Sequence, residues 1–142
     1  MNISDLIWEW ASQNEKKLIL SIYSFGESLE SLSLAPEDQI RVVDGECPFI
    51  EAWYGWRSEV LKFREELNNR SISSFYNNEL LVALDDLSAS FDDLIEEECV
   101  EASEEIFYMN GWGAIRNKSK LPLKLIEWRQ LKECKHDIIK IL

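Results

Sequence analysis

Apolar residues recur at helical spacing through the middle of the chain. From residue 80 onward they advance by four and three residues in turn, and at 100° per residue they fall within one sector of about 140°. The nine positions are Leu80, Leu84, Leu87, Phe91, Leu94, Ile95, Cys99, Ala102 and Ile106. This sector is expected to be buried, and most of the carboxylates between these positions are expected to face outward.

Two carboxylates do not follow this division. Glu98 and Glu105 fall inside the apolar sector, so either the helix breaks near residues 96–99 or these side chains meet bases from elsewhere in the chain. The basic C-terminal segment is the internal candidate for such pairing. Its bases include Lys124, Arg129, Lys132 and Lys135.

The same periodicity, with Pro36, Pro48 and Pro122 near the start of periodic segments, predicts a mainly helical chain. Helices are expected over residues 4–24, 36–43, 48–68, 76–108 (one helix or two in series) and 121–140. Residues 68–74 and 110–120 are expected to be links, with a turn at Gly111-Trp112-Gly113. The predicted fold over residues 1–142 is a single-domain, mainly α bundle of about four to six helices.

An α+β fold with a small sheet is the alternative. β-branched and aromatic residues cluster at residues 17–25, 39–43 and 106–109, as they do in strands. However, no Asn-Gly or Asp-Gly pair lies between two alternating runs, as a β-hairpin would require. The mainly α prediction is therefore favoured.

The acidic residues are concentrated in one segment of the chain, and this uneven distribution bears on the kind of partner. Ser71 to Ile115 contains eleven carboxylates and no Lys or Arg, whereas residues 116–142 carry eight bases and three acids; the net charge of the chain is −12. A surface with one sign of charge attracts a partner of the opposite sign at long range. We expect a basic protein partner, and neither a nucleic acid nor a membrane.

Length and composition indicate one folded domain. The chain has 142 residues, of which 46% are hydrophobic, and no apolar run approaches the length of about 20 residues that crosses a bilayer. The N-terminal residues lack the pattern of a secretion signal, and the three cysteines form no CxxC pair and are expected to be reduced. A cytoplasmic protein is the expectation.

The sequence gives little support for a catalytic site. His136 is the single histidine, which limits nucleophile–base pairs and zinc sites. Glu97-Glu98-Cys99-Val100-Glu101 resembles the EExxE motif of the all-α nucleotide pyrophosphohydrolases of the MazG type, but the ExxD partner motif is missing, since Glu133 and Asp137 are four residues apart. We therefore predict no enzymatic activity, no metal and no cofactor, and keep a MazG-like enzyme as an alternative.

A small, acidic, helical chain with a polarised carboxylate face and no catalytic set resembles bacterial toxin-immunity proteins in type. The resemblance implies an inhibitor that binds a cognate toxin domain, most often a basic nuclease. Under it, the partner-binding residues are Asp85, Asp86, Asp92, Asp93, Glu96 and Glu97, with Tyr108 and Trp112 as apolar anchors at the surface. Of these, Asp85, Asp92, Asp93 and Glu96 are expected to serve binding and not folding. A phage-type anti-CRISPR or anti-restriction protein that imitates nucleic-acid charge is the other alternative.

Overall fold

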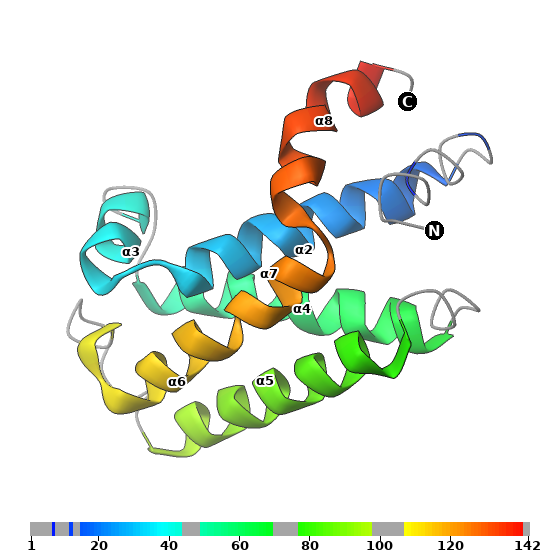
Figure 1. The fold of residues 1–142 in the computed structure, drawn as a ribbon. Coiled ribbons are helices and arrows are strands. Elements are labelled where there is room, and N and C mark those ends of the chain that lie inside the picture. The colour runs from blue at the N-terminus through cyan, green and yellow to red at the C-terminus, as the bar shows by residue number, and fades with distance from the viewer. Residues whose placement is uncertain are drawn as a thin grey trace.

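The computed structural model describes residues 7, 12, 15–43, 49–69, 77–97 and 107–140 (Figure 1). The helices are α2 (Lys16–Ser33), α3 (Pro36–Val43), α4 (Phe49–Asn69), α5 (Asn77–Glu97), α6 (Asn110–Lys118), α7 (Lys120–Leu125) and α8 (Trp128–Lys140). The described residues contain no strand, so the mainly α prediction is confirmed. No helix in these ranges is long and apolar enough to span a membrane.

The apolar stripe of α5 lies in the core, as its spacing predicts. Leu80, Leu84, Leu87, Phe91 and Leu94 are each at most 1% exposed. The later members of the predicted stripe lie outside the described side chains, as do Glu98 and Glu105. In this part of the chain, periodicity alone identifies the buried face correctly.

Three predicted segments differ from the structure. The single helix expected over residues 121–140 is divided into α7 and α8 at Glu127, where φ is positive at 53°. The first helix does not end at residue 24 but continues through Phe25 and Leu29 to Ser33, because its apolar positions keep helical spacing across Gly26. The predicted link at residues 110–120 is also wrong. It contains α6, which forms because Trp112 and Ile115, three residues apart, both lie on a buried face.

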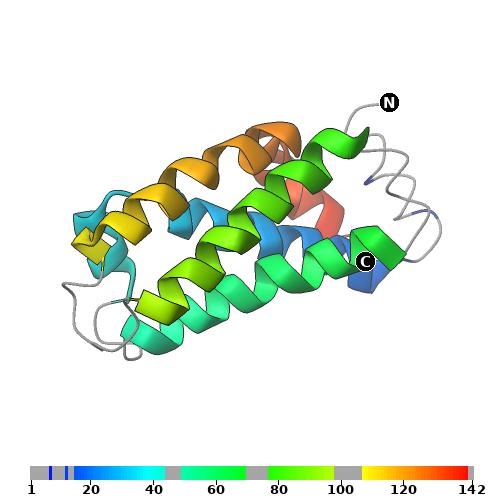
Figure 2. The same cartoon turned by 90° about the horizontal axis from the view of Figure 1, so that it is seen from below.

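The helices are arranged around α2. This helix packs most extensively on α4 and also contacts α3, α6 and α7. Helix α5 lies between α4 on one side and α6 with α7 on the other, as Figure 2 shows from below. Helix α8 projects from the other side of α2 (Figure 1). The acidic helix α5 and the lysine-rich helix α8 therefore occupy opposite sides of the bundle.

Aromatic side chains fill the core between these helices. Phe25 of α2 stacks on Phe63 of α4 with ring centroids 4.4 Å apart. Trp53 of α4 makes edge contacts with Phe91 of α5 at 6.3 Å and with Trp112 of α6 at 6.2 Å. Such edge-to-face pairs stabilise a core beyond the area that they bury, so they join α4, α5 and α6.

The C-terminal helix is held to α2 by two aromatic side chains. Trp128 covers Gly26, where an added Cβ would overlap the indole ring, and its Nε1–H donates to Glu30 at 2.5 Å. The hydroxyl of Tyr23 donates to the carbonyl of Leu131 at 2.9 Å. Burial, with Cys134 close by, raises the pKa of Tyr23 and keeps this hydroxyl protonated as a donor.

A half-buried arginine fixes the end of the bundle where α2, α3 and α6 meet. Arg116 Nε donates to the carbonyl of Leu34 at 2.6 Å, and Nη2 donates to the carbonyl of Phe107 at 2.9 Å and to Gln39 Oε1 at 3.1 Å. Gln39 is fully buried and donates in turn to the carbonyls of Ser31 and Leu32. Burial lowers the pKa of Arg116, and the nearby carboxylate of Glu37 opposes this shift.

Candidate partner-binding face

The exposed residues of α5 form one continuous strip, which we call the α5 outer face. It consists of Glu79, Val82, Asp85, Asp86, Ala89, Asp92 and Asp93. Helix α5 contains seven carboxylates and no Lys or Arg. Because the apolar stripe occupies the opposite side of the helix, the carboxylates of Glu79, Asp85, Asp86, Asp92 and Asp93 lie at the surface.

Three aspartates of this face form ion pairs with neighbouring helices. Toward α4, Arg64 Nη2 lies 2.5 Å from Asp85 Oδ1, and Arg57 Nη2 lies 3.7 Å from Asp92 Oδ1. Toward α6, Lys118 Nζ lies 3.1 Å from Asp86 Oδ1 and 2.9 Å from Ser90 Oγ. The carboxylates of Asp85 and Asp92 thus link α5 to α4, and the expectation that they serve binding and not folding stays a prediction.

The other acidic positions differ from these three. Asp93 is exposed and has no ion-pair partner in the described part of the chain. Glu96 and Glu97 belong to α5, but their side chains lie outside the described residues, so their predicted role stays a prediction. Asp93 is thus the aspartate on this face that tests binding without breaking a contact within the bundle.

Charge reversal should separate these roles. Asp85→Lys is expected to lower the free energy of unfolding by about 1 kcal/mol, because it removes an exposed ion pair and places a lysine beside Arg64. Asp93→Lys makes the same charge change where no pair exists and should leave stability unchanged or slightly raised. Urea denaturation of both proteins measures the difference, and equal stabilities would show that the Arg64 pair contributes nothing.

The ion pairs do not remove the acidic character of the face. The paired carboxylates of Asp85, Asp86 and Asp92 keep 58%, 60% and 70% of their side-chain surface exposed. Arg57, Arg64 and Lys118 are the three bases that pair with the seven carboxylates of α5 among the described residues. The α5 outer face therefore keeps excess negative charge, and ion pairs hold three of its four aspartates in place.

An apolar hollow lies at the first half of α5. It has a volume of about 600 Å³ and is lined by Glu79, Val82, Ala83, Asp86 and Leu121. Val82 is 64% exposed and Leu121, from α7, is 46% exposed. The carboxylates of Glu79 and Asp86 border this apolar surface.

One feature of the sequence indicates this hollow. Val82 lies about 200° around the helix from Leu80, on the side opposite the apolar stripe. An apolar side chain that deviates in this way from the pattern of a surface helix is a candidate for contact with a partner. Leu121 could not be assigned to the same site, since its approach to α5 depends on how α7 packs.

The two predicted aromatic anchors have different positions. Tyr108 is 56% exposed, and its hydroxyl donates to Glu37 Oε1 at 3.4 Å. Trp112 is fully buried between Phe107 and Trp53, so the expectation that it lies at the surface is wrong. The glycines on both sides of Trp112 do not end the helix there, and burial of the large indole in the core outweighs their low helix propensity.

The basic C-terminal segment pairs with α2. Lys132 Nζ lies 3.0 Å from Glu30 Oε2, and Lys135 Nζ lies 2.5 Å from Glu27 Oε1. The suggested partners of this segment, Glu98 and Glu105, lie outside the described residues. These two lysines therefore act with Trp128 in holding α8 to α2.

No metal-binding cluster appears in the ranges that the structure describes. No three side chains of His, Cys, Asp and Glu come together there in a way that could hold a metal ion. His136 is exposed on α8. Glu98 and Glu101 of the EExxE segment are outside these ranges, so the pyrophosphohydrolase alternative stays a prediction.

Comparison of the chain with protein-family models, curated proteins and solved structures found no match.

Proposed function

We propose that this protein binds and neutralises a basic protein through the α5 outer face, as a toxin-immunity protein binds its toxin. The observation that carries the proposal is the exposure of Val82 and Leu121 inside a border of carboxylates. Protein interfaces commonly combine an apolar centre, which supplies much of the affinity, with a polar rim. This arrangement suits a partner that carries an apolar side chain among lysines and arginines.

The internal ion pairs support binding in two ways. They hold Asp85, Asp86 and Asp92 in place before the partner arrives, so less side-chain freedom is lost on association. They also leave the outer surface of each carboxylate open to a second cation. Excess negative charge on α5 would then increase the rate of encounter with a basic partner, most of all at low salt.

A nuclease toxin domain acting in the cytoplasm fits this chemistry. A nuclease holds an anionic backbone with lysines and arginines, and the same side chains are attracted by a row of exposed carboxylates. Helix α5 lies at the surface of the bundle (Figure 2), and its exposed aspartates provide such a row. The proposed mechanism is steric and electrostatic blockage of the partner and requires no catalysis by this chain.

Asp93→Lys should test the proposal without disturbing the fold. The unaltered protein is used as bait in lysate of the native host, and the partner that it retains is then purified. Asp93→Lys is expected to weaken the affinity of that partner by about tenfold, which is about 1.4 kcal/mol, in titration calorimetry. The loss should become smaller at high salt.

Asp137→Lys is the matched control, because Asp137 is exposed on α8, away from α5. It makes the same change in net charge and should leave the affinity nearly unchanged. An equal loss of affinity with Asp137→Lys would show that binding depends on the net charge of the protein and not on the α5 outer face. Unaltered affinity with Asp93→Lys, together with indifference to salt, would contradict the proposal.

A further inference from the structure

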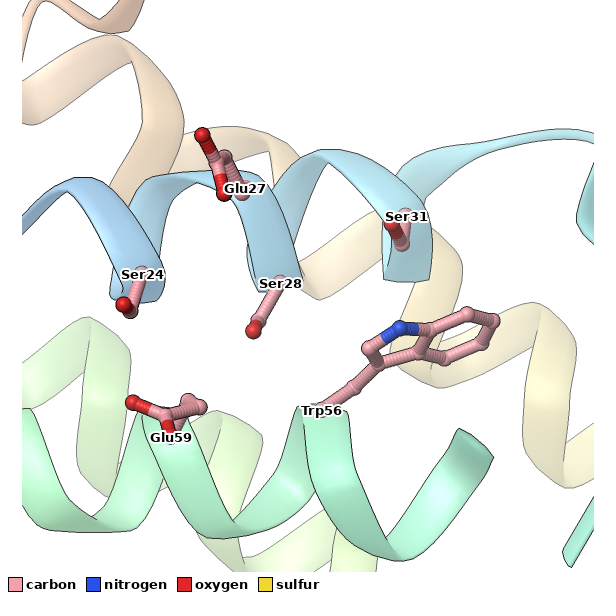
Figure 3. Close-up of a pocket in the computed structure, with 6 residues that line it drawn as sticks. All are labelled: Ser24, Glu27, Ser28, Ser31, Trp56 and Glu59. Atoms are coloured by element: carbon pink, nitrogen blue, oxygen red, sulfur yellow. The ribbon is translucent and has the colours of Figure 1, made fainter. Parts of the chain in front are cut away.

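A second surface feature lies between α2 and α4, away from α5. It is a polar hollow of about 320 Å³, at the small end of the range of ligand pockets. Figure 3 shows its lining, which consists of Ser24, Glu27, Ser28 and Ser31 from α2 and Trp56 and Glu59 from α4. We call it the α2–α4 hollow.

The hydroxyl groups in this hollow have no hydrogen-bond partner in the described part of the chain. Ser28 is only 7% exposed, its hydroxyl points toward α4 (Figure 3), and it makes no hydrogen bond to any described residue. The hydroxyls of Ser90 and Ser119, by contrast, donate to the carbonyls four residues before them. Ser28 Oγ opens into the hollow and is therefore available as an acceptor for a group that enters it.

Two glutamates line the hollow, and only one of them, Glu59, directs into it a negative charge that is unpaired within the described ranges. Glu27 points away from α4 and pairs with Lys135. Glu59 reaches the hollow from α4 and has no ion-pair or hydrogen-bond partner among the described residues. Trp56 lies at one end of the hollow, where its indole ring is held 6.3 Å from the ring of Phe107.

We propose that the α2–α4 hollow binds a guanidinium group. Glu59 would accept two N–H bonds from one edge of the group, and the hydroxyl oxygens of Ser24 and Ser28 would accept from the other N–H donors. The planar cation can also stack on the half-buried indole of Trp56. An ammonium group suits the hollow less well, because it is compact, strongly hydrated and does not stack.

This site is independent of the proposed function. Glu59 lies about 200° around α4 from Arg57, which pairs with Asp92 of α5, so the hollow and the α5 outer face are on different flanks of α4. The guanidinium source is either a free small molecule or an arginine side chain of a protein. Both sources share the chemistry that the hollow recognises.

Titration calorimetry with N-acetyl-arginine amide tests the proposal on the full chain. Saturable binding is expected, whereas N-acetyl-citrulline amide, which is nearly the same shape but uncharged, should bind at least tenfold more weakly. Glu59→Gln should lower the affinity for the arginine derivative at least tenfold, and Ser28→Ala should lower it a fewfold. Equal binding of the two derivatives, or unaltered binding by Glu59→Gln protein, would overturn the proposal.

Matched controls assign the effect to the hollow. Glu65→Gln makes the same change on the exposed side of α4 and should bind like the unaltered protein. Trp56→Phe should remove most of the fluorescence change that ligand binding produces, although five other tryptophans remain. If Glu65→Gln lowers the affinity as much as Glu59→Gln does, binding depends on overall charge and the site is not the α2–α4 hollow.

A capped Ala-Ala-Arg-Ala-Ala peptide separates the two sources. Affinity equal to that of the arginine derivative indicates a small-molecule site, and affinity at least tenfold higher indicates an arginine displayed by a protein. Asp93→Lys protein should bind both ligands normally, so failure of the partner-binding proposal would leave this one standing. Absence of binding by both the derivative and the peptide would overturn it.

Discussion

Arg116→Met protein is expected to lose about 3 kcal/mol of its free energy of unfolding. The guanidinium group donates to the carbonyls of Leu34 and Phe107 and to the side chain of Gln39, which is itself fully buried. Methionine keeps the apolar stem but provides no donor, so three acceptors at the junction of α2, α3 and α6 lose their partner. Hydrogen bonds to a charged group contribute about 1.5–3 kcal/mol each, and part of this is recovered by water.

Urea denaturation monitored by circular dichroism measures this loss. Arg41→Met is the matched control, because Arg41 is 80% exposed and its ion pair among the described residues is with Asp38 on its own helix. It should change stability by less than about 0.5 kcal/mol. Arg116→Lys should recover only part of the loss, since an ammonium group cannot reach the three acceptors with the geometry of a fork. Equal stabilities for Arg116→Met and Arg41→Met would show that the junction does not depend on this arginine.

Gly26→Ala is expected to destabilise the protein by about 2 kcal/mol, although alanine is the better helix former. An added Cβ would overlap the indole ring of Trp128, and this ring is held by its hydrogen bond to Glu30. The ring must therefore move, and α8 must move with it. The steric cost outweighs the gain of up to about 1 kcal/mol that replacing a helical glycine normally gives.

At Gly55 on α4, substitution by alanine should have the opposite effect on stability. Nothing lies within 4 Å of a Cβ added there, and the residue is exposed in a helix. Gly55→Ala should therefore raise the free energy of unfolding by about 0.5–1 kcal/mol. Thermal denaturation of the two variants should show shifts of opposite sign. If Gly26→Ala also stabilises the protein, close packing of Trp128 on α2 is not required.

Much of the fold follows from local periodicity. The stripe from Leu80 to Leu94 predicts the buried face of α5, and the bounds expected for α3 and α4 agree closely with the structure. These features depend on the residues within one helix, and a single sequence contains that information. The exposed acidic side of α5 is predictable for the same reason.

The other features of the fold and of the α5 outer face depend on contacts between helices. The pairing of Asp85 with Arg64 and of Asp86 with Lys118 depends on how α4 and α6 lie beside α5, which periodicity does not determine. The burial of Trp112 and the close approach of Trp128 to Gly26 have the same origin. Sequence reasoning therefore identified the acidic face correctly but could not distinguish its paired aspartates from the unpaired Asp93.

The contacts between α2 and α8 have a consequence for synthesis of the chain on the ribosome. Tyr23 and its partner Leu131 are 108 residues apart, and at a rate of about 5–20 residues per second the second is made roughly 5–20 s after the first. Throughout this interval the surface of α2 at Gly26 lacks the indole that later covers it. The nascent chain therefore displays an uncovered apolar helix for seconds, a time long enough for chaperones to recognise it, and the final docking of α8 removes that recognition surface.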